Sequence, residues 1–313
     1  GSIGQRHLKI INSLRPEINI YVLRRSKDNH TDLDHLIKKV FTNIDDAIDF
    51  GFDAAIIASP SNLHISQAIK LIKNKIPILI EKPLSNKLSD CSKLLKTFNE
   101  NKTVVLVGYV LRYSSVLKRF REIILKEDFS KINSINIKCS SYLPYWRKIK
   151  NYKESVSAKK SLGGGALLEL SHELDYANWI FGPFINIRSQ IINSGKLDID
   201  VEDEVKISAN NKIGIPIKID LDFYKKNNER YCLVNLKDGL IKLDFIHKQI
   251  IYKNSNVFRK EILKEDFDAM YKNQIKHFFL CIEKGIKPHI TLDDGISTME
   301  LINSVLKSNL QSV

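Results

Sequence analysis

The feature that most constrains the fold of this chain is a strand–helix–strand pattern between residues 53 and 83. Residues 54–58 form a short apolar run that ends at Ser59-Pro60, and residues 76–80 form a second run. Between the two runs, Ser61 and Asn62 are suited to cap a helix whose apolar positions recur at helical spacing. Short apolar runs separated by an amphipathic helix are typical of buried parallel strands, so the sequence predicts an α/β domain.

The second of these strands leads directly into Glu81-Lys82-Pro83. Ligands of open α/β sheets bind beyond the carboxyl ends of the strands. A lysine that precedes proline is held in an extended conformation, so its amine can be aimed into a cleft. An isolated lysine is ordinarily a solvated surface charge, but the position after a buried strand makes Lys82 a candidate site residue.

The amino terminus points to a dinucleotide. Gly1-Ser2-Ile3-Gly4 matches the second half of a G-x-G-x-x-G fingerprint that opens a helix, and residues 18–23 follow as a strand. No strand precedes Gly1 in the sequence as given. We therefore expect a dinucleotide-binding domain that is truncated within its motif. The alternative is that Gly1-Ser2 is a cloning remnant and the match is partly accidental.

The densest group of reactive side chains lies at residues 163–175. Three consecutive glycines run into a helical pattern, which would let a ligand approach the backbone without a Cβ in the way. Glu169, His172 and Asp175 follow at intervals of three, so on one helix their side chains can touch. A carboxylate beside an imidazole raises its basicity, as proton transfer near neutral pH requires. A hydrogen-bonded core feature without a chemical role is the alternative.

Taken together, these motifs resemble the glucose-fructose oxidoreductase and inositol dehydrogenase family, Gfo/Idh/MocA. The resemblance covers nearly the whole chain, and Glu81-Lys82-Pro83 is its most specific signature. The other matching segments are Gly1-Ser2-Ile3-Gly4, residues 57–64, Val107-Gly108-Tyr109 with Arg112, the triple glycine with His172, and Asp293-Asp294-Gly295. Many relatives place an Asp four residues before the histidine, whereas here Glu169 precedes it by three. Residues 171–176 resemble a subgroup found near surface-polysaccharide sugar pathways.

The resemblance implies hydride exchange between NAD(P) and a carbon of a sugar, polyol or nucleotide sugar. It places Lys82 and His172 near the nicotinamide and the reacting hydroxyl, and we expect Glu169 to act with His172. Cofactor contacts are expected at Gly1, Ser2, Ile3, Gly4, Arg24, Arg25, Ser59, Pro60, Asn62, His64, Glu81 and Lys82. Substrate contacts are expected at Tyr109, Arg112, Trp146, Arg147, Tyr152 and Asp175.

Composition excludes several classes of protein. The four cysteines are scattered without a C-x-x-C pair, which favours a reducing compartment, the cytoplasm, and no metal site. No stretch approaches the roughly 18 apolar residues of a membrane span. The net charge of +13 is spread along the chain among acidic residues, so we expect no nucleic-acid partner. An excess of positive charge does favour anionic substrates such as nucleotide sugars.

Strand and helix patterns alternate up to about residue 107 and then change. We expect a doubly wound Rossmann domain at residues 1–112, without its first strand, and a substrate-binding and oligomerisation domain at residues 113–313. The second domain should carry a large, mostly antiparallel open sheet, with hairpin turns at Asn210-Asn211 and Asp238-Gly239. Helices are expected at about 116–126, 266–284 and 292–310. In this family the open sheet face commonly pairs subunits, so the resemblance implies a homo-oligomer.

The end of the strand at residues 20–23 bears on the choice of cofactor. Sites selective for NAD usually carry an acid there, whereas Arg accommodates the additional phosphate of NADP. Here the strand ends in Arg24-Arg25-Ser26, which favours NADP over NAD, unless these arginines face solvent or stack on adenine. A non-catalytic, cofactor-binding regulator or scaffold of the same fold is the alternative function.

Overall fold

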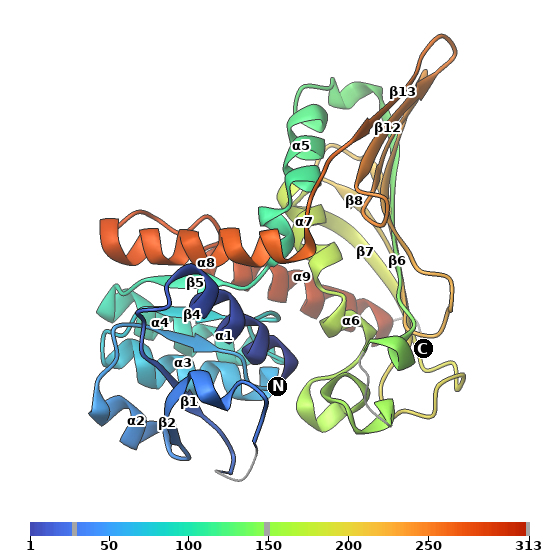
Figure 1. Ribbon diagram of the computed structural model, residues 1–313. Coiled ribbons are helices and arrows are strands. Elements are labelled where there is room, and N and C mark those ends of the chain that lie inside the picture. The colour runs from blue at the N-terminus through green and yellow to red at the C-terminus, as the bar shows by residue number, and fades with distance from the viewer. Residues whose placement is uncertain (27–29, 147–150, 311–313) are drawn as a thin grey trace. The chain divides into compact units, whose positions relative to one another are not determined.

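The computed structural model describes residues 1–26, 30–146 and 151–310 and divides the chain into two compact units (Figure 1). The first unit comprises residues 1–110 and 267–293, and the second comprises residues 111–266 and 294–313. Among the described residues, no helix is long and apolar enough to cross a membrane.

The first unit is built from parallel strands and helices, as predicted. Its strands are β1 (Ile20–Leu23), β2 (Ile37–Phe41), β3 (Ala55–Ile57), β4 (Ile78–Ile80) and β5 (Val105–Val107). Its helices are α1 (Ser2–Leu14), α2 (Ile44–Phe50), α3 (Ser61–Lys73), α4 (Cys91–Asn101) and α8 (Phe267–Lys284). The strands form a parallel pair, β1-β2, and a parallel sheet of order β3-β4-β5. Within the described residues, no strand ladder joins these two sheets.

The core of the first unit lies around β4 and β5, whose side chains are all buried. Helix α3 packs on β3 and β4. The predicted cap of this helix was wrong, because the helix begins one residue after Pro60 and the buried Ser61 hydroxyl has no hydrogen-bond partner. Helix α8 comes from far along the sequence and packs on α1, where Arg15 forms an ion pair with Glu283 at 2.6 Å.

The second unit contains an open eight-stranded sheet of order β13-β12-β11-β10-β6-β9-β8-β7, which confirms the expected architecture. Its strands are β6 (Ile132–Ser140), β7 (Phe184–Ile192), β8 (Glu204–Asn211), β9 (Pro216–Asp222), β10 (Glu229–Leu236), β11 (Gly239–Asp244), β12 (Gln249–Asn254) and β13 (Phe258–Ile262). All neighbours are antiparallel except β6 and β9. Alternate residues of the central strands are buried, so one face of the sheet is the core.

Helices α5 (Ser115–Ile124), α6 (Ala166–Glu169) and α7 (His172–Phe181) pack on this sheet. Helix α9 (Leu292–Leu310) begins at the last residues of the first unit and continues in the second. The hairpin expected at Asn210-Asn211 was misplaced. Both residues belong to β8, and the Asn211 side chain accepts hydrogen bonds from the amides of Ile213 and Ile215, which moves the turn to residues 212–215.

Three loops lie together at one end of the strands of this sheet. Residues 141–146 follow β6, residues 193–203 connect β7 to β8, and residues 223–228 connect β9 to β10. Backbone hydrogen bonds join them, from Ser141 N to Asp222 O at 3.0 Å, from Leu143 N to Phe223 O at 2.9 Å, and from Phe223 N to Asp203 O at 2.9 Å. We call this the loop edge of the sheet.

Candidate active site

In the first unit, the expected site residues gather at the carboxyl ends of β3 and β4. Ser59 and Pro60 follow β3, and Lys82, which is half-buried, follows β4. His64 lies between these two loops with 1% of its surface exposed. Its Nδ1 is 2.9 Å from Pro83 O and its Nε2 is 2.8 Å from Ser59 O. Burial lowers the pKa of His64, so a neutral ring donates to one of these carbonyls and holds the loops in place.

Glu81 is held by a residue from the other end of the domain. Its Oε1 lies 2.6 Å from Nε2 of His7 on α1, and both side chains are buried. A Cβ at Gly108 would come within 2.9 Å of Glu81 Cα and 3.1 Å of its Oε2. Only glycine therefore fits where β5 ends beside Glu81. The amino-terminal motif, Glu81 and Gly108 thus form one packed group that supports the loop carrying Lys82.

The start of α1 is suited to hold an anion. The helix follows Gly1, carries no acidic residue in its first turn, and has no side-chain cap. The first amides of a helix have no partner within it, and the helix dipole favours negative charge at this end. No atom lies within 4 Å of the position where Gly1 would bear a Cβ. These features fit the pyrophosphate of a dinucleotide. Asn62, in the first turn of α3, is exposed.

The two arginines after β1 differ in environment. The Arg24 guanidinium forms two hydrogen bonds with the Asp34 carboxylate and is largely buried. This contact lowers the pKa of Asp34 and raises that of Arg24. Arg25 is exposed, and the described part of the chain provides it with no ion-pair partner. Of the two arginines, Arg25 is therefore the one available to an additional phosphate.

In the second unit, the triple glycine is packed against protein. Gly163 and Gly165 have positive φ angles of 80° and 112°. A Cβ at Gly165 would lie 2.3 Å from Glu202 Oε1, and one at Gly164 would lie 2.5 Å from Val156 O. The expectation that these glycines leave room for a ligand is thus corrected at Gly164 and Gly165. Glu202 accepts a hydrogen bond from Leu167 N at 3.1 Å, and burial raises its pKa.

Glu169 and His172 lie on two helices and not on one. Glu169 is the last residue of α6 and His172 is the first residue of α7, and both are half-buried. Between them, Leu170 has φ −94° and ψ 18°, which interrupts the helical hydrogen-bond ladder. The prediction of one continuous helix with a shared face was wrong at this point. His172 is consequently placed at a helix amino terminus, where a positive charge is disfavoured.

The two acids that follow His172 are completely buried in ion pairs. Glu173 Oε1 accepts hydrogen bonds from Arg230 of β10 at 2.8 Å and 2.5 Å. The Asp175 carboxylate binds Arg112 through both oxygens, at 2.9 Å and 2.7 Å. Arg112 also donates to Asp294 at 2.9 Å. Helix α7, which carries His172, is therefore fixed by buried charges on either side.

One guanidinium between two carboxylates leaves a surplus of negative charge. Asp175 has no exposed surface, and burial raises its pKa to about 6 in spite of Arg112, with Asp294 adding to the effect. Because Arg112 and Asp175 satisfy each other, their contacts are those of a structural pair joining the start of the second unit to α7 and α9.

The remaining expected substrate residues differ in exposure. Tyr109 is completely buried. Trp146 lies on the loop edge, where its Nε1 donates to Ser141 at 2.7 Å and its ring meets Phe223 edge-on at 4.9 Å. Tyr152 is half-buried at the start of a short 3₁₀ turn, Tyr152–Glu154. Arg147 lies outside the described residues.

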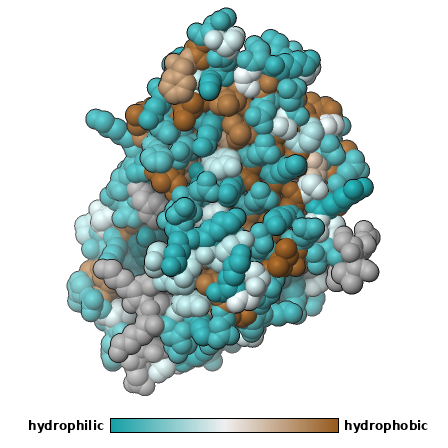
Figure 2. Space-filling view, turned by 90° about the vertical axis from the view of Figure 1, so that its right-hand side faces the viewer, coloured by the Kyte–Doolittle hydropathy of each residue, from teal (hydrophilic) through white to brown (hydrophobic). Residues whose placement is uncertain are grey.

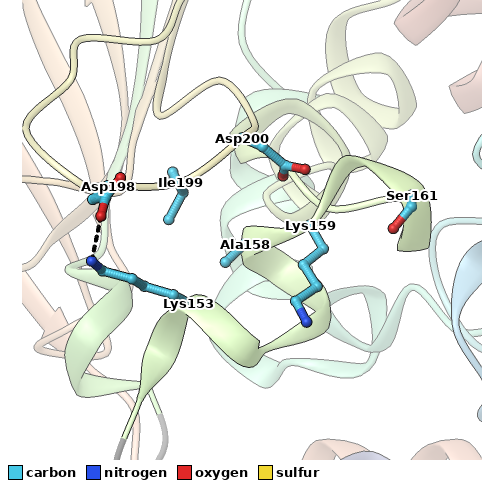
Figure 3. Close-up of a pocket in the computed structure, with 7 residues that line it drawn as sticks. All are labelled: Lys153, Ala158, Lys159, Ser161, Asp198, Ile199 and Asp200. Atoms are coloured by element: carbon cyan, nitrogen blue, oxygen red, sulfur yellow. Dashed lines mark hydrogen bonds and ion pairs between the residues drawn. The ribbon is translucent and has the colours of Figure 1, made fainter.

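An open cleft of about 420 Å³ lies in the second unit beside the loop edge (Figure 3). It is lined by Lys153, Ala158, Lys159, Ser161, Asp198, Ile199 and Asp200. Lys153 bridges the cleft to Asp198 at 2.5 Å. Lys159 carries no ion pair among the residues drawn in Figure 3. The cleft is thus polar and ends in loop 193–203, which also holds Glu202.

Sequence reasoning missed His7 and Asp34 as partners of the expected site residues Glu81 and Arg24. It also missed Glu202 and Arg230, which hold the segments on either side of His172. His7 follows the amino-terminal motif by three residues, but its partner Glu81 is 74 residues away. Arg230 and Glu173 are 57 residues apart. No local spacing signals such contacts.

Comparisons with known proteins agree with this geometry. The profile of an oxidoreductase family with an NAD-binding Rossmann fold, GFO_IDH_MocA, matches residues 1–109. The profile of the family's C-terminal alpha/beta domain matches residues 121–312.

Two sequence relatives act on sugars, by their names. The 2,7-anhydro-N-acetylneuraminate hydratase of Escherichia coli is 25% identical over 198 residues, 61% of this chain and 51% of the relative. The glucose-6-phosphate 3-dehydrogenase of Bacillus subtilis is 25% identical over 143 residues, 46% of this chain and 40% of the relative. The matched regions span about half or less of the lengths of these two relatives.

Solved structures share the fold over the whole chain. A levoglucosan dehydrogenase in complex with NADH and levoglucosan matches with a TM-score of 0.87 and 16% identity, covering 100% of this chain and 96% of that one. The WlbA dehydrogenase of Bordetella pertussis, in complex with NADH and UDP-GlcNAcA, matches with a TM-score of 0.83 and 17% identity, covering 99% and 94%. The two profile matches, together with motifs that pack as one group, show that the chain belongs to the Gfo/Idh/MocA oxidoreductase family.

Proposed function

We propose that the protein is an NAD(P)-dependent oxidoreductase that transfers a hydride to or from a hydroxyl-bearing carbon of a sugar, polyol or nucleotide sugar. The observation that carries this proposal is the position of Lys82, which follows β4 at the ligand-binding end of a parallel sheet. Within the second unit, His172 begins a helix fixed by buried ion pairs. Two relatives named for sugar substrates, and two fold neighbours solved in complex with NADH and a carbohydrate ligand, support it.

The residues divide the chemistry between them. The cofactor supplies the hydride-accepting or hydride-donating carbon of its nicotinamide ring. His172 takes the hydroxyl proton during oxidation and returns it during reduction. The Lys82 ammonium stabilises the negative charge that develops on the same oxygen. Glu169, at the end of α6, is the acid to which we assign the role of raising the basicity of the His172 imidazole.

The other residues bind and position. We assign the pyrophosphate to the first turn of α1, and the loops of Ser59, Pro60 and Asn62 to the cofactor. We assign substrate contacts to Trp146 and Tyr152. Arg112 and Asp175 act from the core by fixing helix α7, and Tyr109 is a buried core residue. The free, buried cysteines fit a reducing compartment such as the cytoplasm.

The open face of the second unit's sheet is our proposed subunit interface. Figure 2 shows hydrophobic and hydrophilic side chains interspersed on the face it displays. Exposed apolar residues of the β12–β13 hairpin include Phe258 and Ile262, with 69% and 64% of their surface exposed. Measurement of the mass in solution tests the homo-oligomer, and a monomer at all concentrations would contradict it.

Replacing His172 tests the mechanism most directly. We expect His172→Ala to lower the turnover of an active sugar substrate by about 10²- to 10⁴-fold, the usual scale of acid–base catalysis, with cofactor binding retained. The matched control is His247→Ala, because His247 is an exposed histidine of the same unit.

Lys82→Ala should lower turnover and also weaken cofactor or substrate binding. Glu169→Gln should shift the pH–rate profile. Full activity in His172→Ala would overturn the mechanism, and cofactor binding without turnover on any sugar would indicate a regulator.

The structure also supports a preference for NADP over NAD. No acid follows β1 directly, and the exposed Arg25 is free to meet a phosphate, although the two compared neighbours contain NADH. We expect Arg25→Ala to lower kcat/KM for NADP more than for NAD. Arg24→Ala should affect both cofactors similarly, because Arg24 holds Asp34. A clear preference of the unaltered protein for NAD would contradict this assignment.

A further inference from the structure

We propose that a basic and aromatic patch on the loop edge of the second unit binds the diphosphate and base of a nucleoside diphosphate. The patch consists of Tyr142, Tyr145, Lys196, Tyr224, Lys225 and Lys226. This inference rests on the proposed function, because it selects nucleotide sugars among the possible substrates. It assigns their non-reacting end to residues outside the family motifs.

All six residues lie on the three loops of the loop edge. Tyr142 and Tyr145 follow β6, Lys196 lies between β7 and β8, and the other three follow β9. The backbone hydrogen bonds between these loops, such as that from Leu143 N to Phe223 O, fix their spacing. The patch is therefore a built surface, formed where three loops are tied together.

Three lysines of this surface lie against its tyrosine rings. The Nζ atoms of Lys196 and Lys225 lie 3.7 Å and 5.6 Å from the ring centroid of Tyr224. The Nζ of Lys226 lies 6.0 Å from the ring centroid of Tyr142. Cation–π contacts hold such ammonium groups in place, but like charges gathered in this way repel one another. An anion between them would remove that repulsion.

The carboxylates nearby do not neutralise the patch. Asp222 pairs with Lys225 at 3.2 Å, and Glu204 pairs with Lys206 at 3.1 Å. For Lys196 and Lys226, the described residues provide no ion pair with a carboxylate. Two ammonium charges are thus left for a ligand. A diphosphate presents two adjacent anionic groups and fits this requirement.

An exposed aromatic ring completes the patch. Tyr145 has 72% of its surface exposed, and its ring meets Tyr142 edge-on with centroids 4.7 Å apart. The contact orients the Tyr145 ring while leaving much of its surface to solvent. A nucleobase stacks readily on such a ring, whereas a simple sugar or inorganic phosphate gains less from it.

Contacts link the loops of the patch to the start of α6, the helix that precedes the one carrying His172. Phe223 N donates to Asp203 O. The neighbouring Glu202 accepts a hydrogen bond from Leu167 N and lies against Gly165, at the start of α6. A nucleotide bound to the patch would therefore have its sugar directed along this loop toward the catalytic helices. The cleft lined by Lys159 adjoins the same loop.

Calorimetric titration with UDP, without sugar or cofactor, tests the proposal. We expect the double variant Lys196→Glu/Lys226→Glu to bind UDP at least about tenfold more weakly than the unaltered protein, because two attractive charges become repulsive. The matched control is Lys131→Glu/Lys237→Glu. Both lysines are exposed at the opposite end of β6, where Lys237 N donates to Lys131 O, and their reversal changes the overall charge by the same amount without touching the patch.

Two further ligands separate the parts of the site. Tyr145→Ala should weaken the binding of UDP by about fivefold or more and leave the binding of inorganic pyrophosphate unchanged, since only the base stacks on the ring. Equal affinity for UDP and pyrophosphate, with no effect of Tyr145→Ala, would show a simple anion site and overturn the nucleoside assignment. UDP binding that is absent, or that is unchanged in the lysine double variant, would overturn the patch itself.

The outcome is separable from that of the proposed function. Oxidation of an unsubstituted sugar without UDP binding would reject the patch and leave the dehydrogenase intact. UDP binding that depends on the patch, without turnover on any UDP-sugar or sugar, would support the patch and reject the dehydrogenase.

Discussion

The two units fix their candidate site residues in different ways. In the first unit, buried histidines reach a neighbouring loop or carboxylate: His64 meets two backbone carbonyls, and His7 meets Glu81. In the second unit, arginines hold the acids beside His172, with Arg230 on Glu173 and Arg112 on Asp175. The first unit thus positions loops through individual buried histidines. The second unit positions a helix through ion pairs in which each arginine donates two hydrogen bonds to one carboxylate.

This difference predicts unequal sensitivity to substitution. Both sets of contacts are buried, but Glu81 keeps a second contact, from Lys82 N to its Oε2 at 3.3 Å, whereas the remaining oxygen of Glu173 has no hydrogen-bond partner among the described residues. A single hydrogen bond contributes little net stability, whereas a buried charge without its partner is strongly destabilising. The helix that carries His172 should therefore depend on a few charged pairs, while the loop that carries Lys82 should tolerate the loss of one contact. Both tryptophans, Trp146 and Trp179, lie in the second unit, so tryptophan fluorescence reports on that unit alone.

The largest effect is expected for Arg230→Met. It leaves the completely buried Glu173 without its partner, and we expect the free energy of unfolding to fall by about 3–5 kcal/mol. Urea unfolding followed by tryptophan fluorescence measures it. The double variant Arg230→Met/Glu173→Leu should recover much of the loss, because it removes the stranded charge. An equal loss in both variants would mean that shape, and not charge, anchors α7.

A smaller effect is expected for His7→Leu in the first unit. Loss of the contact at 2.6 Å leaves the buried Glu81 with fewer partners, which should cost about 1–3 kcal/mol in the free energy of unfolding. Urea unfolding followed by far-UV circular dichroism is suitable, with the exposed His35→Leu as control. A loss as large as that of Arg230→Met would abolish the contrast between the units.

A more gradual effect, counted per pH unit, is expected in the pH dependence of the second unit. The pKa of Asp175 rises from 3.8 to about 6 on folding, so between these values the folded protein holds a proton that the unfolded chain has released. Its contribution to stability is complete below pH 3.8 and is lost as the pH rises through about 6. We expect this contribution to fall by at most about 1.4 kcal/mol per pH unit. Asp175→Asn should remove this slope, and an identical pH profile in that variant would place the proton elsewhere.

Local patterns were sufficient for much of the fold. The apolar runs around residues 56 and 79 became β3 and β4, and the helix expected at about 292–310 has those bounds in the structure. Such elements follow from periodicity and need no knowledge of partners. The position of Lys82 after a buried strand followed in the same way.

The details of the candidate site could not be predicted because they depend on distant contacts. The helix break at Leu170 and Ser171 occurs at two buried residues, so tertiary packing overrides the helical pattern there. The glycines at 164 and 165 suggested space for a ligand, but Val156 and Glu202 occupy it. The sequence did not show that Asp175 pairs with Arg112, which lies 63 residues earlier.

The separation of the first unit's strands into a pair and a triplet has a consequence for how this unit opens. The amides of β4, in the middle of the triplet and completely buried, should exchange with deuterium most slowly. The amides of β1 and β2 have only one neighbouring strand among the described residues and should exchange sooner. We therefore expect the segment that carries Arg24 and Arg25 to exchange faster than the centre of the β3-β4-β5 sheet. Occupation of that segment by the adenine end of a cofactor would register as a local slowing of exchange, a footprint that requires no turnover to observe.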